Sequence, residues 1–308
     1  MLAHPTLDLL HALGLHGMAK GYQEIAAHPE ARALDHAEWL GLLLEHEVTL
    51  RRQKRFETRA RAARLRHPAS VEDVDYRTHR GLDRALFLKL AACDWVRSRR
   101  NALITGPCGV GKSWLACALG HKACREDLSV LYYRVPRLFA ALALARGDGR
   151  YGKLLRQLAR ANLLILDDWG PEPLLPEQAR DLLEIVEDRY DAGSLLITSQ
   201  VPVDRWYDII AIPTLADAVL DRVVHNAYRI ELSGESLRKR KAAEPVTDLP
   251  APSMMIHLRP ARRRRPAAFR SEWWPASRRN SGRLEIGMPE GSNGSRRDQC
   301  LRALTGPI

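Results

Sequence analysis

The chain carries the stretch Gly106-Pro-Cys-Gly-Val-Gly-Lys-Ser113, and the prediction of its fold starts there. The stretch fits G-x-x-x-x-G-K-[S/T], the pattern of a loop that binds the phosphates of a nucleotide. Its glycines let backbone N–H groups turn inward around phosphate oxygens, its lysine adds a positive charge, and its serine offers a hydroxyl to Mg²⁺. The predicted contacts with ATP are Gly106, Pro107, Cys108, Gly109, Val110, Gly111, Lys112, Ser113 and Trp114.

The residues around this loop have the order that a phosphate-binding loop requires. Residues 102–105 form a short apolar run, which is typical of a buried parallel strand. Residues 113–126 contain few helix breakers and place apolar side chains at helical spacing. A strand, a glycine loop and a helix in this order point the positive end of the helix dipole at the phosphates. The alternative, a glycine-rich turn without a ligand, is disfavoured by this order.

A second apolar run, residues 162–166, ends in two carboxylates, Asp167 and Asp168. Acids at the C-terminal end of a buried strand lie where open α/β sheets bind their ligands. We expect Asp167 to hold Mg²⁺ together with Ser113, and Asp168 to orient or polarise the attacking water. The alternative is a pair of solvated turn acids before Gly170, and the loop upstream argues against it.

Composition excludes several other classes of protein. Hydrophobic residues make up 45% of the chain, which supports a sizeable core, yet no apolar run approaches the ~20 residues of a membrane helix. The N-terminus lacks a secretory signal pattern, and the five cysteines form no C-x-x-C pair, so we expect a cytoplasmic protein without a zinc site. The net charge is +11, and residues 245–308 contribute twelve arginines against five acids.

The predicted organisation has three parts. Residues 1–78 form a small all-helical domain, in which the segment 51–66 carries eight basic residues and one acid. We expect this segment to contact DNA phosphates. The alternatives are an ordinary solvated helix face and a face that pairs with a partner's acids. The predicted DNA contacts are Arg51, Arg52, Lys54, Arg55 and Arg59.

Residues 79–243 form the predicted ATPase domain, which begins with a linker helix over 79–100. Strands at 102–105, 129–134, 161–168, 194–200 and 228–232 alternate with helices at 113–126, 136–146, 176–190 and 214–227. This alternation predicts an α/β fold with a parallel sheet covered by helices. The arginine- and proline-rich residues 244–308 are expected to be disordered, either as a non-selected extension or as a functional tail in which Trp273 and Trp274 stack on bases.

Six motifs then resemble one known family in order and spacing. They are Gly106–Ser113, Leu163-Leu-Ile-Leu-Asp-Asp-Trp-Gly170, Ile197-Thr-Ser-Gln200, Pro213-Thr-Leu-Ala-Asp-Ala218, Leu220-Asp-Arg-Val-Val-His-Asn-Ala227 and Gly234-Glu-Ser-Leu-Arg-Lys239. The chain resembles, over residues 1–243, the IstB-type helper ATPases of insertion sequences, which are relatives of the DnaC helicase loaders and the DnaA initiators. The resemblance implies an AAA+ P-loop fold and a homo-oligomer that assembles on DNA with ATP at the seams between subunits.

The resemblance also implies roles for three further residues. Gln200 matches the sensor-1 position that reads the γ-phosphate, Arg222 matches the arginine finger that reaches the neighbour's nucleotide, and Arg238 matches the sensor-2 arginine. A planar guanidinium suits the spread charge of a phosphoryl transition state. On sequence grounds alone, both arginines could equally be ordinary surface residues.

Three features depart from the family pattern. The acid after Asp167 is an aspartate, where many AAA+ ATPases carry glutamate, so we expect slow hydrolysis. Ala211 and Ile212 stand where relatives commonly carry Gly-Asp, which makes the loop before Pro213 harder to predict. The arginine-rich tail is foreign to the pattern.

The expected function is that of an ATPase that assists transposition. ATP binding would drive assembly on duplex DNA, the assembly would present target DNA to a partner transposase, and hydrolysis would reset the complex. One alternative is a DnaC-like helicase loader, whose DNA would be single-stranded. A small-molecule kinase is disfavoured by the basic segment 51–66, and a non-hydrolysing DNA-binding module by Lys112, Ser113 and Asp167.

Overall fold

The computed structural model describes residues 4–28 and 34–237 of the chain. The chain divides into two compact units, residues 1–247 and 248–308, and every described residue belongs to the first. The predicted tail 244–308 therefore lies outside the described residues, as does Arg238. Among the described helices none is both long and apolar enough to cross a membrane.

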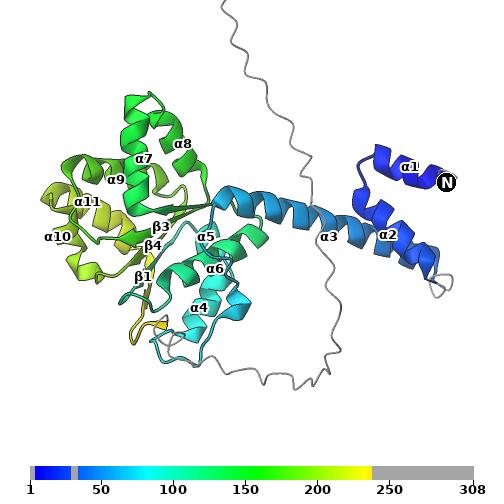
Figure 1. Cartoon of the computed structure of the whole chain (residues 1–308), viewed down its shortest axis with the longest axis horizontal. Coiled ribbons are helices and arrows are strands. Elements are labelled where there is room, and N and C mark those ends of the chain that lie inside the picture. Colours follow the sequence, from blue (N-terminus) through cyan, green and yellow to red (C-terminus); the bar gives the residue numbers. More distant parts are fainter. Residues whose placement is uncertain (1–3, 29–33, 238–308) are drawn as a thin grey trace, which may run out of the picture. The chain divides into compact units, whose positions relative to one another are not determined.

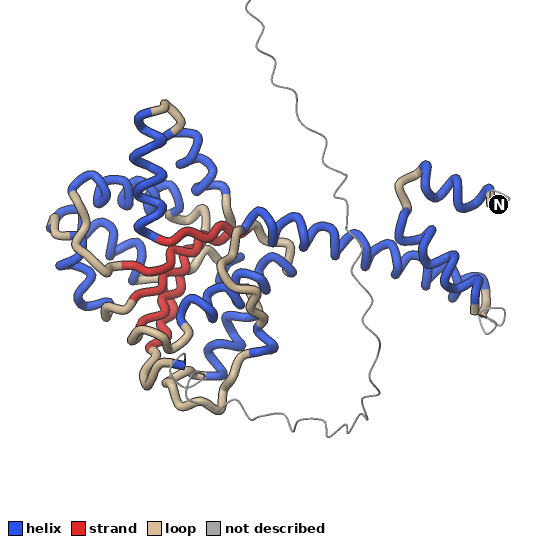
Figure 2. The backbone as a smooth tube through the Cα atoms, viewed as in Figure 1, coloured by secondary structure: helices blue, strands red, loops and turns tan. Residues whose placement is uncertain are grey.

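The centre of the first unit is a five-stranded parallel sheet with the strand order β2-β3-β4-β1-β5 (Figure 2). The strands are β1 (Asn101–Thr105), β2 (Val130–Arg134), β3 (Leu163–Trp169), β4 (Ser194–Ser199) and β5 (Ala227–Glu231). β1, β3 and β4 lie inside the sheet and are buried almost throughout, which explains their continuous apolar sequences. All four strand pairings are parallel, as the alternation of strands and helices predicted.

Alternate side chains of the strands build two separate cores on the two faces of the sheet. Leu164, Leu166 and Ile197 point into a core covered by five helices, whereas Ile104 and Ile165 point into a core beneath α6. The five helices are α7 (Val135–Gly147), α8 (Tyr151–Arg160), α9 (Pro176–Arg189), α10 (Trp206–Ile210) and α11 (Pro213–Val224). On the opposite face lie α4 (Arg84–Ala91), α5 (Asp94–Arg97) and α6 (Lys112–Arg125) (Figure 1).

The N-terminal region is helical, as predicted. It contains α1 (Pro5–Ala12), α2 (His16–Ala27) and the long α3 (His36–Ala63), which includes most of the basic segment. The carboxylate of Glu47 on α3 accepts hydrogen bonds from the backbone N–H groups of Gly17 (2.6 Å) and Met18 (3.1 Å) at the start of α2. Arg51 donates to the same carboxylate at 2.6 Å. This buried acid therefore joins α2 to α3.

The segment that follows α3 belongs to the core beneath α6. Ala63, Ala69 and Val74 are buried in that core, and a short 3₁₀ helix, η2 (Val71–Asp73), lies within the segment. The predicted division into residues 1–78 and 79–243 stays a prediction. α3 and the residues that follow it contact the sheet domain directly.

Two local expectations were wrong. Residues 79–100 do not form one linker helix, because Cys93 adopts a left-handed conformation with φ of 63° and separates α4 from α5. Both short helices contribute to the core through Phe87, Leu90 and Trp95. In addition, residues 151–160 form α8, where the sequence analysis expected no helix.

Candidate active site at the phosphate loop

The phosphate loop connects β1 to α6 and is shaped by close backbone contacts. Gly106 and Gly109 have positive φ angles of 142° and 87°. A Cβ atom at Gly106 would lie 2.2 Å from the carbonyl oxygen of Leu232, and one at Gly109 would lie 2.1 Å from Oγ of Ser236. These two glycines are therefore required by the packing of the residues after β5 as well as by a phosphate ligand.

Lys112 is the first residue of α6, and its side chain is buried beneath the loop. Its ammonium group donates hydrogen bonds to the carbonyl oxygens of Gly106 and Pro107, both at 2.7 Å. Burial lowers the pKa of Lys112, and the nearby acids offset only part of this effect. The charge is thus held at the N-terminal end of a helix, where phosphate oxygens bind favourably.

Asp167 lies in the C-terminal half of β3 and is fully buried within a polar network. Its Oδ1 accepts hydrogen bonds from Oγ of Ser113 (2.7 Å) and from the hydroxyl of Thr198. Its Oδ2 accepts a hydrogen bond from the hydroxyl of Tyr132 at 2.5 Å, and burial together with this carboxylate raises the pKa of Tyr132. Three hydroxyl groups therefore fix the orientation of this carboxylate.

The oxygen atoms of Ser113 and Asp167 fit a bound Mg²⁺. They are hard oxygen ligands only 2.7 Å apart, and Mg²⁺ is usually held by one or two such groups together with waters and substrate phosphates. The described residues contain no group of three or more histidine, cysteine or acidic side chains that could form a metal site made of protein ligands alone. The donor set thus suits a metal ion that arrives with the triphosphate.

Asp168 follows Asp167 but has a different environment. Its backbone is left-handed, with φ of 59°, and its N–H donates to the hydroxyl of Thr198 at 3.2 Å. Its carboxylate accepts a hydrogen bond from Nε of Arg134 at 2.8 Å and forms an ion pair with a terminal nitrogen of the same guanidinium at 2.6 Å. This carboxylate raises the pKa of Arg134. Any water held by Asp168 must share the carboxylate with this guanidinium.

A cavity of about 810 Å³ joins these groups. The predicted site residues that line it are Cys108, Gly109, Gly111, Lys112, Ser113, Trp114, Asp168 and Gln200. Gln200 directly follows β4 and lines the same cavity as the phosphate loop, and its predicted role in reading the γ-phosphate stays a prediction. The side chain of Val110 is fully buried. The carbonyl oxygen of this loop residue accepts a hydrogen bond from Arg80 at 3.2 Å.

Arg222 does not line this cavity. It lies on α11, where it donates to the carbonyl oxygen of Ala218 and forms an ion pair with Glu187 at 3.4 Å. The side chain of Asn101, the first residue of β1, donates to the carbonyl oxygen of Arg222, whereas the phosphate loop follows the last residue of β1. A five-residue strand spans roughly 15 Å, so Arg222 and the loop lie at opposite ends of the sheet.

The predicted DNA contacts on α3 fall into two groups. Arg51 is paired with Glu47, and both Arg55 and Arg59 are paired with Asp127, at 3.7 Å and 2.6 Å. Arg52 and Lys54 are exposed and form no ion pair with another described residue. Part of the basic charge on this helix is therefore balanced within the chain.

Several residues of the site were not predicted from the sequence. Tyr132, Arg134 and Thr198 contact the two acids, and Arg66 and Arg80 line the cavity. Arg134 ends β2, and in a parallel sheet it must lie at the same edge as Asp167, with which it pairs in register. The position of Arg134 could therefore have been predicted from the sequence. The positions of Arg66 and Arg80 could not, because both residues lie outside the sheet.

Known proteins resemble this chain at the levels of structure and sequence. A crystal structure of DnaI covers 55% of this chain and 90% of its own, with a TM-score of 0.47 and 23% identity. A crystal structure of the DnaC helicase loader covers 58% of this chain and 99% of its own, with a TM-score of 0.40 and 20% identity.

Sequence relatives are much more similar. A protein of Sinorhizobium fredii, named as an insertion sequence ATP-binding protein, is 63% identical over 241 residues, which are 78% of this chain and 98% of the relative. An IS21 ATP-binding protein of Pseudomonas aeruginosa is 33% identical over 78% of this chain and 91% of its own length. The family model described as IstB-like ATP binding protein matches residues 8–245. The predicted α/β fold with a parallel sheet covered by helices is confirmed, and the chain belongs to the family of IstB-like ATP binding proteins of insertion sequences.

Proposed function

We propose that the protein is an ATPase that assembles on duplex DNA and presents it as a target to a partner transposase. The observation that carries this proposal is the hydrogen bond between Ser113 and Asp167 beneath a lysine-bearing phosphate loop. This arrangement, in a chain whose relatives are named insertion sequence ATP-binding proteins, supports use of ATP during transposition.

The side chains of the cavity divide the work of ATP hydrolysis. Lys112 neutralises the β- and γ-phosphate oxygens, while Ser113 and Asp167 would hold a Mg²⁺ ion that arrives with ATP. That ion would supply further positive charge against the triphosphate. Asp168 orients the attacking water, and Gln200 contacts the terminal phosphate. The contact between Arg134 and Asp168 supports slow turnover, because the carboxylate is partly engaged by a guanidinium.

The position of Arg222 supports an active site completed by a neighbouring subunit. The residue is far from the phosphate loop of its own chain, and its side chain is about one-third exposed. An arginine at such a place can reach the triphosphate of a second copy, where its planar fork stabilises the spread negative charge of the transition state. ATP would then hold neighbouring subunits together, and hydrolysis would release them.

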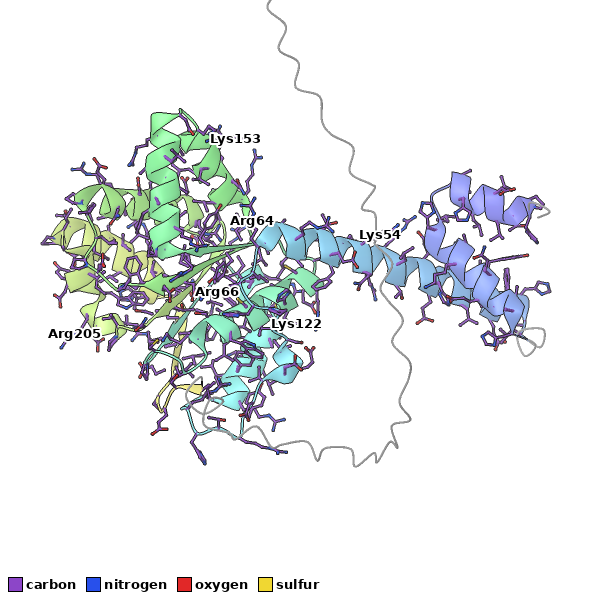
Figure 3. The ribbon with its side chains drawn as sticks, viewed as in Figure 1. Lys54, Arg64, Arg66, Lys122, Lys153 and Arg205 are labelled. Atoms are coloured by element: carbon purple, nitrogen blue, oxygen red, sulfur yellow. The ribbon has the colours of Figure 1, made fainter. Side chains whose placement is uncertain are left out.

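The charge on α7 and α8 supports a DNA surface broader than the one predicted from α3. Residues 135–160 carry six basic side chains and one acid. Arg137, Lys153, Arg156 and Arg160 are exposed and, within the described part of the chain, form no ion pair. Figure 3 shows Lys153 on α8 and Lys54 on α3. α3, α7 and α8 would all contact DNA phosphates, which bind proteins largely through charge.

Electron microscopy of the full chain with duplex DNA and a non-hydrolysable ATP analogue tests this function. We expect ordered assemblies that require both ligands. A triple variant Lys153→Glu, Arg156→Glu, Arg160→Glu should lose DNA-dependent assembly while ATP binding persists. A matched control, Glu177→Gln on the exposed start of α9, should assemble normally. Assembly on single-stranded DNA alone would favour a helicase loader and overturn the proposal.

A further inference from the structure

The chain that leaves α3 runs directly into the ATP cavity. After Ala63, Arg64 adopts a left-handed conformation with φ of 54°, which turns the chain away from the helix axis. Leu65 then packs against α6, since a Cβ atom at Gly120 would lie only 2.9 Å from its side chain. The next residue, Arg66, is labelled in Figure 3. Arg66 lines the same cavity as Lys112 and Asp168.

Arg66 contacts the buried acid of the site without being fixed by it. A terminal nitrogen of Arg66 lies 3.9 Å from Oδ2 of Asp167, the same oxygen that accepts the hydrogen bond from Tyr132. The arginine side chain is 39% exposed, whereas Asp167 is fully buried. A guanidinium at this distance keeps donors that can bind phosphate oxygens through its planar fork. Its position suits a third positive group for the triphosphate, beside Lys112.

α3 also contacts the C-terminal end of α6. Arg55 and Arg59 on α3 are paired with Asp127, which lies two residues after the last residue of α6. The ring of Phe56 also lies near that of His121 on α6, with centroids 6.4 Å apart. α6 begins at Lys112, so α3 and Leu65 contact the same helix that carries the lysine of the phosphate loop. The segment after α3 then places Arg66 in the cavity that Lys112 lines.

DNA would act on this connection by charge. Arg55 and Arg59 face one carboxylate, and the phosphates of a duplex would compete with Asp127 for both guanidinium groups. Ion pairs of this kind at the protein surface are weak, so a polyanion can displace them. The candidate DNA surface on α3 is thus connected to the nucleotide cavity by the three residues that follow this helix, Arg64, Leu65 and Arg66.

We propose that Arg66 binds the phosphates of ATP and transmits the binding of DNA on α3 to the rate of ATP hydrolysis. This inference rests on the proposed function, because it requires both DNA binding and hydrolysis. The DNA-free protein holds α3 through Asp127. Duplex DNA takes over Arg55 and Arg59, and the shift of α3 changes the contact of Arg66 with the triphosphate.

The test compares ATP hydrolysis with and without saturating duplex DNA in the full chain. The variants are Arg66→Ala, Arg66→Lys and a matched control, Arg61→Ala, which removes an exposed arginine of α3 that does not line the cavity. We expect DNA to raise kcat in the wild type and in the control. In Arg66→Ala the ratio of DNA-stimulated to DNA-free kcat should fall to about one, with an increase in KM for ATP, while DNA affinity stays unchanged. Arg66→Lys should restore KM more than the ratio, because lysine keeps the charge without the fork.

A second variant keeps the inference testable if Arg66→Ala fails to fold. Asp127→Asn removes the carboxylate that DNA would displace, so its DNA-free kcat should rise towards the DNA-stimulated value of the wild type. Stimulation of Arg66→Ala equal to that of the wild type, or an unchanged DNA-free rate in Asp127→Asn, would overturn the inference and leave the proposed function intact. A wild-type protein that binds no duplex DNA would instead refute the proposed function itself.

Discussion

The contact between Glu47 and the start of α2 gives a sharp prediction about the N-terminal helices. Glu47→Gln replaces a buried carboxylate that accepts hydrogen bonds from Gly17, Met18 and Arg51. Glutamine keeps one acceptor oxygen but loses the charge, and a hydrogen bond to a charged group is worth about 1.5–3 kcal/mol. We therefore expect opening of α2 to become easier by about 1–3 kcal/mol, which corresponds to roughly 5- to 150-fold in the opening equilibrium.

Hydrogen exchange of the α2 amides measures this opening directly, because exchange reports local unfolding. Glu45→Gln is the matched control, since Glu45 is an exposed acid on the same helix. Equal protection of α2 in the two variants would refute the role given to Glu47.

The stabilisation by Glu47 also depends on pH. Burial acts to raise the pKa of Glu47, but the hydrogen bonds from Arg51, Met18 and Gly17 outweigh it, so the pKa in the folded protein is lowered. The stabilisation is thus present above the ordinary glutamate pKa and is lost as pH falls through the lowered value.

Three further substitutions test the phosphate loop, the DNA surface and the subunit boundary. Lys112→Ala should weaken binding of a fluorescent ATP analogue by about 10- to 150-fold, because it removes a charged contact with the phosphates; unchanged affinity would contradict the loop assignment. Asp127→Asn should tighten DNA binding and steepen the salt dependence of log K by about one to two units, since it frees Arg55 and Arg59; an unaltered slope would move the DNA site away from this end of α3. Arg222→Ala should keep ATP binding and lose about 10³-fold in hydrolysis, and mixing it with Asp168→Ala protein should restore part of the activity; no recovery would count against a finger acting across subunits.

The sheet and the loop were predictable because their signals are local. β1 and β3 are short apolar runs next to residues with special roles, and their predicted ends agree with the structure within one or two residues. The single helix expected over 79–100 failed because Cys93 takes a left-handed conformation, for which a cysteine gives no sequence signal. α8 was not predicted, although its Leu155 and Leu158 pack into the core.

The candidate site was predictable where each partner of a contact stands at a fixed place in a recognisable motif. Ser113 of the phosphate loop and Asp167 of the second motif were expected to share a metal ion, and the structure joins them by a hydrogen bond. The partners of Asp168 and of the α3 arginines depend on tertiary contacts across more than thirty residues, as between Arg134 and Asp168 or Arg59 and Asp127. Periodicity and composition carry no information about such pairs, so the net positive charge of segment 51–66 overstated the charge left for DNA.

The contacts of Gly106 and Gly109 with Leu232 and Ser236 have a consequence for how mutational tolerance in this chain should be interpreted. Both glycines would be intolerant of replacement in a screen that selects only for a folded, abundant protein, with no demand for ATP. Loss of transposition in a glycine variant therefore says little about nucleotide use. Nucleotide use is better tested by removing a loop side chain in a way that leaves the backbone undisturbed. Ser113 is such a position.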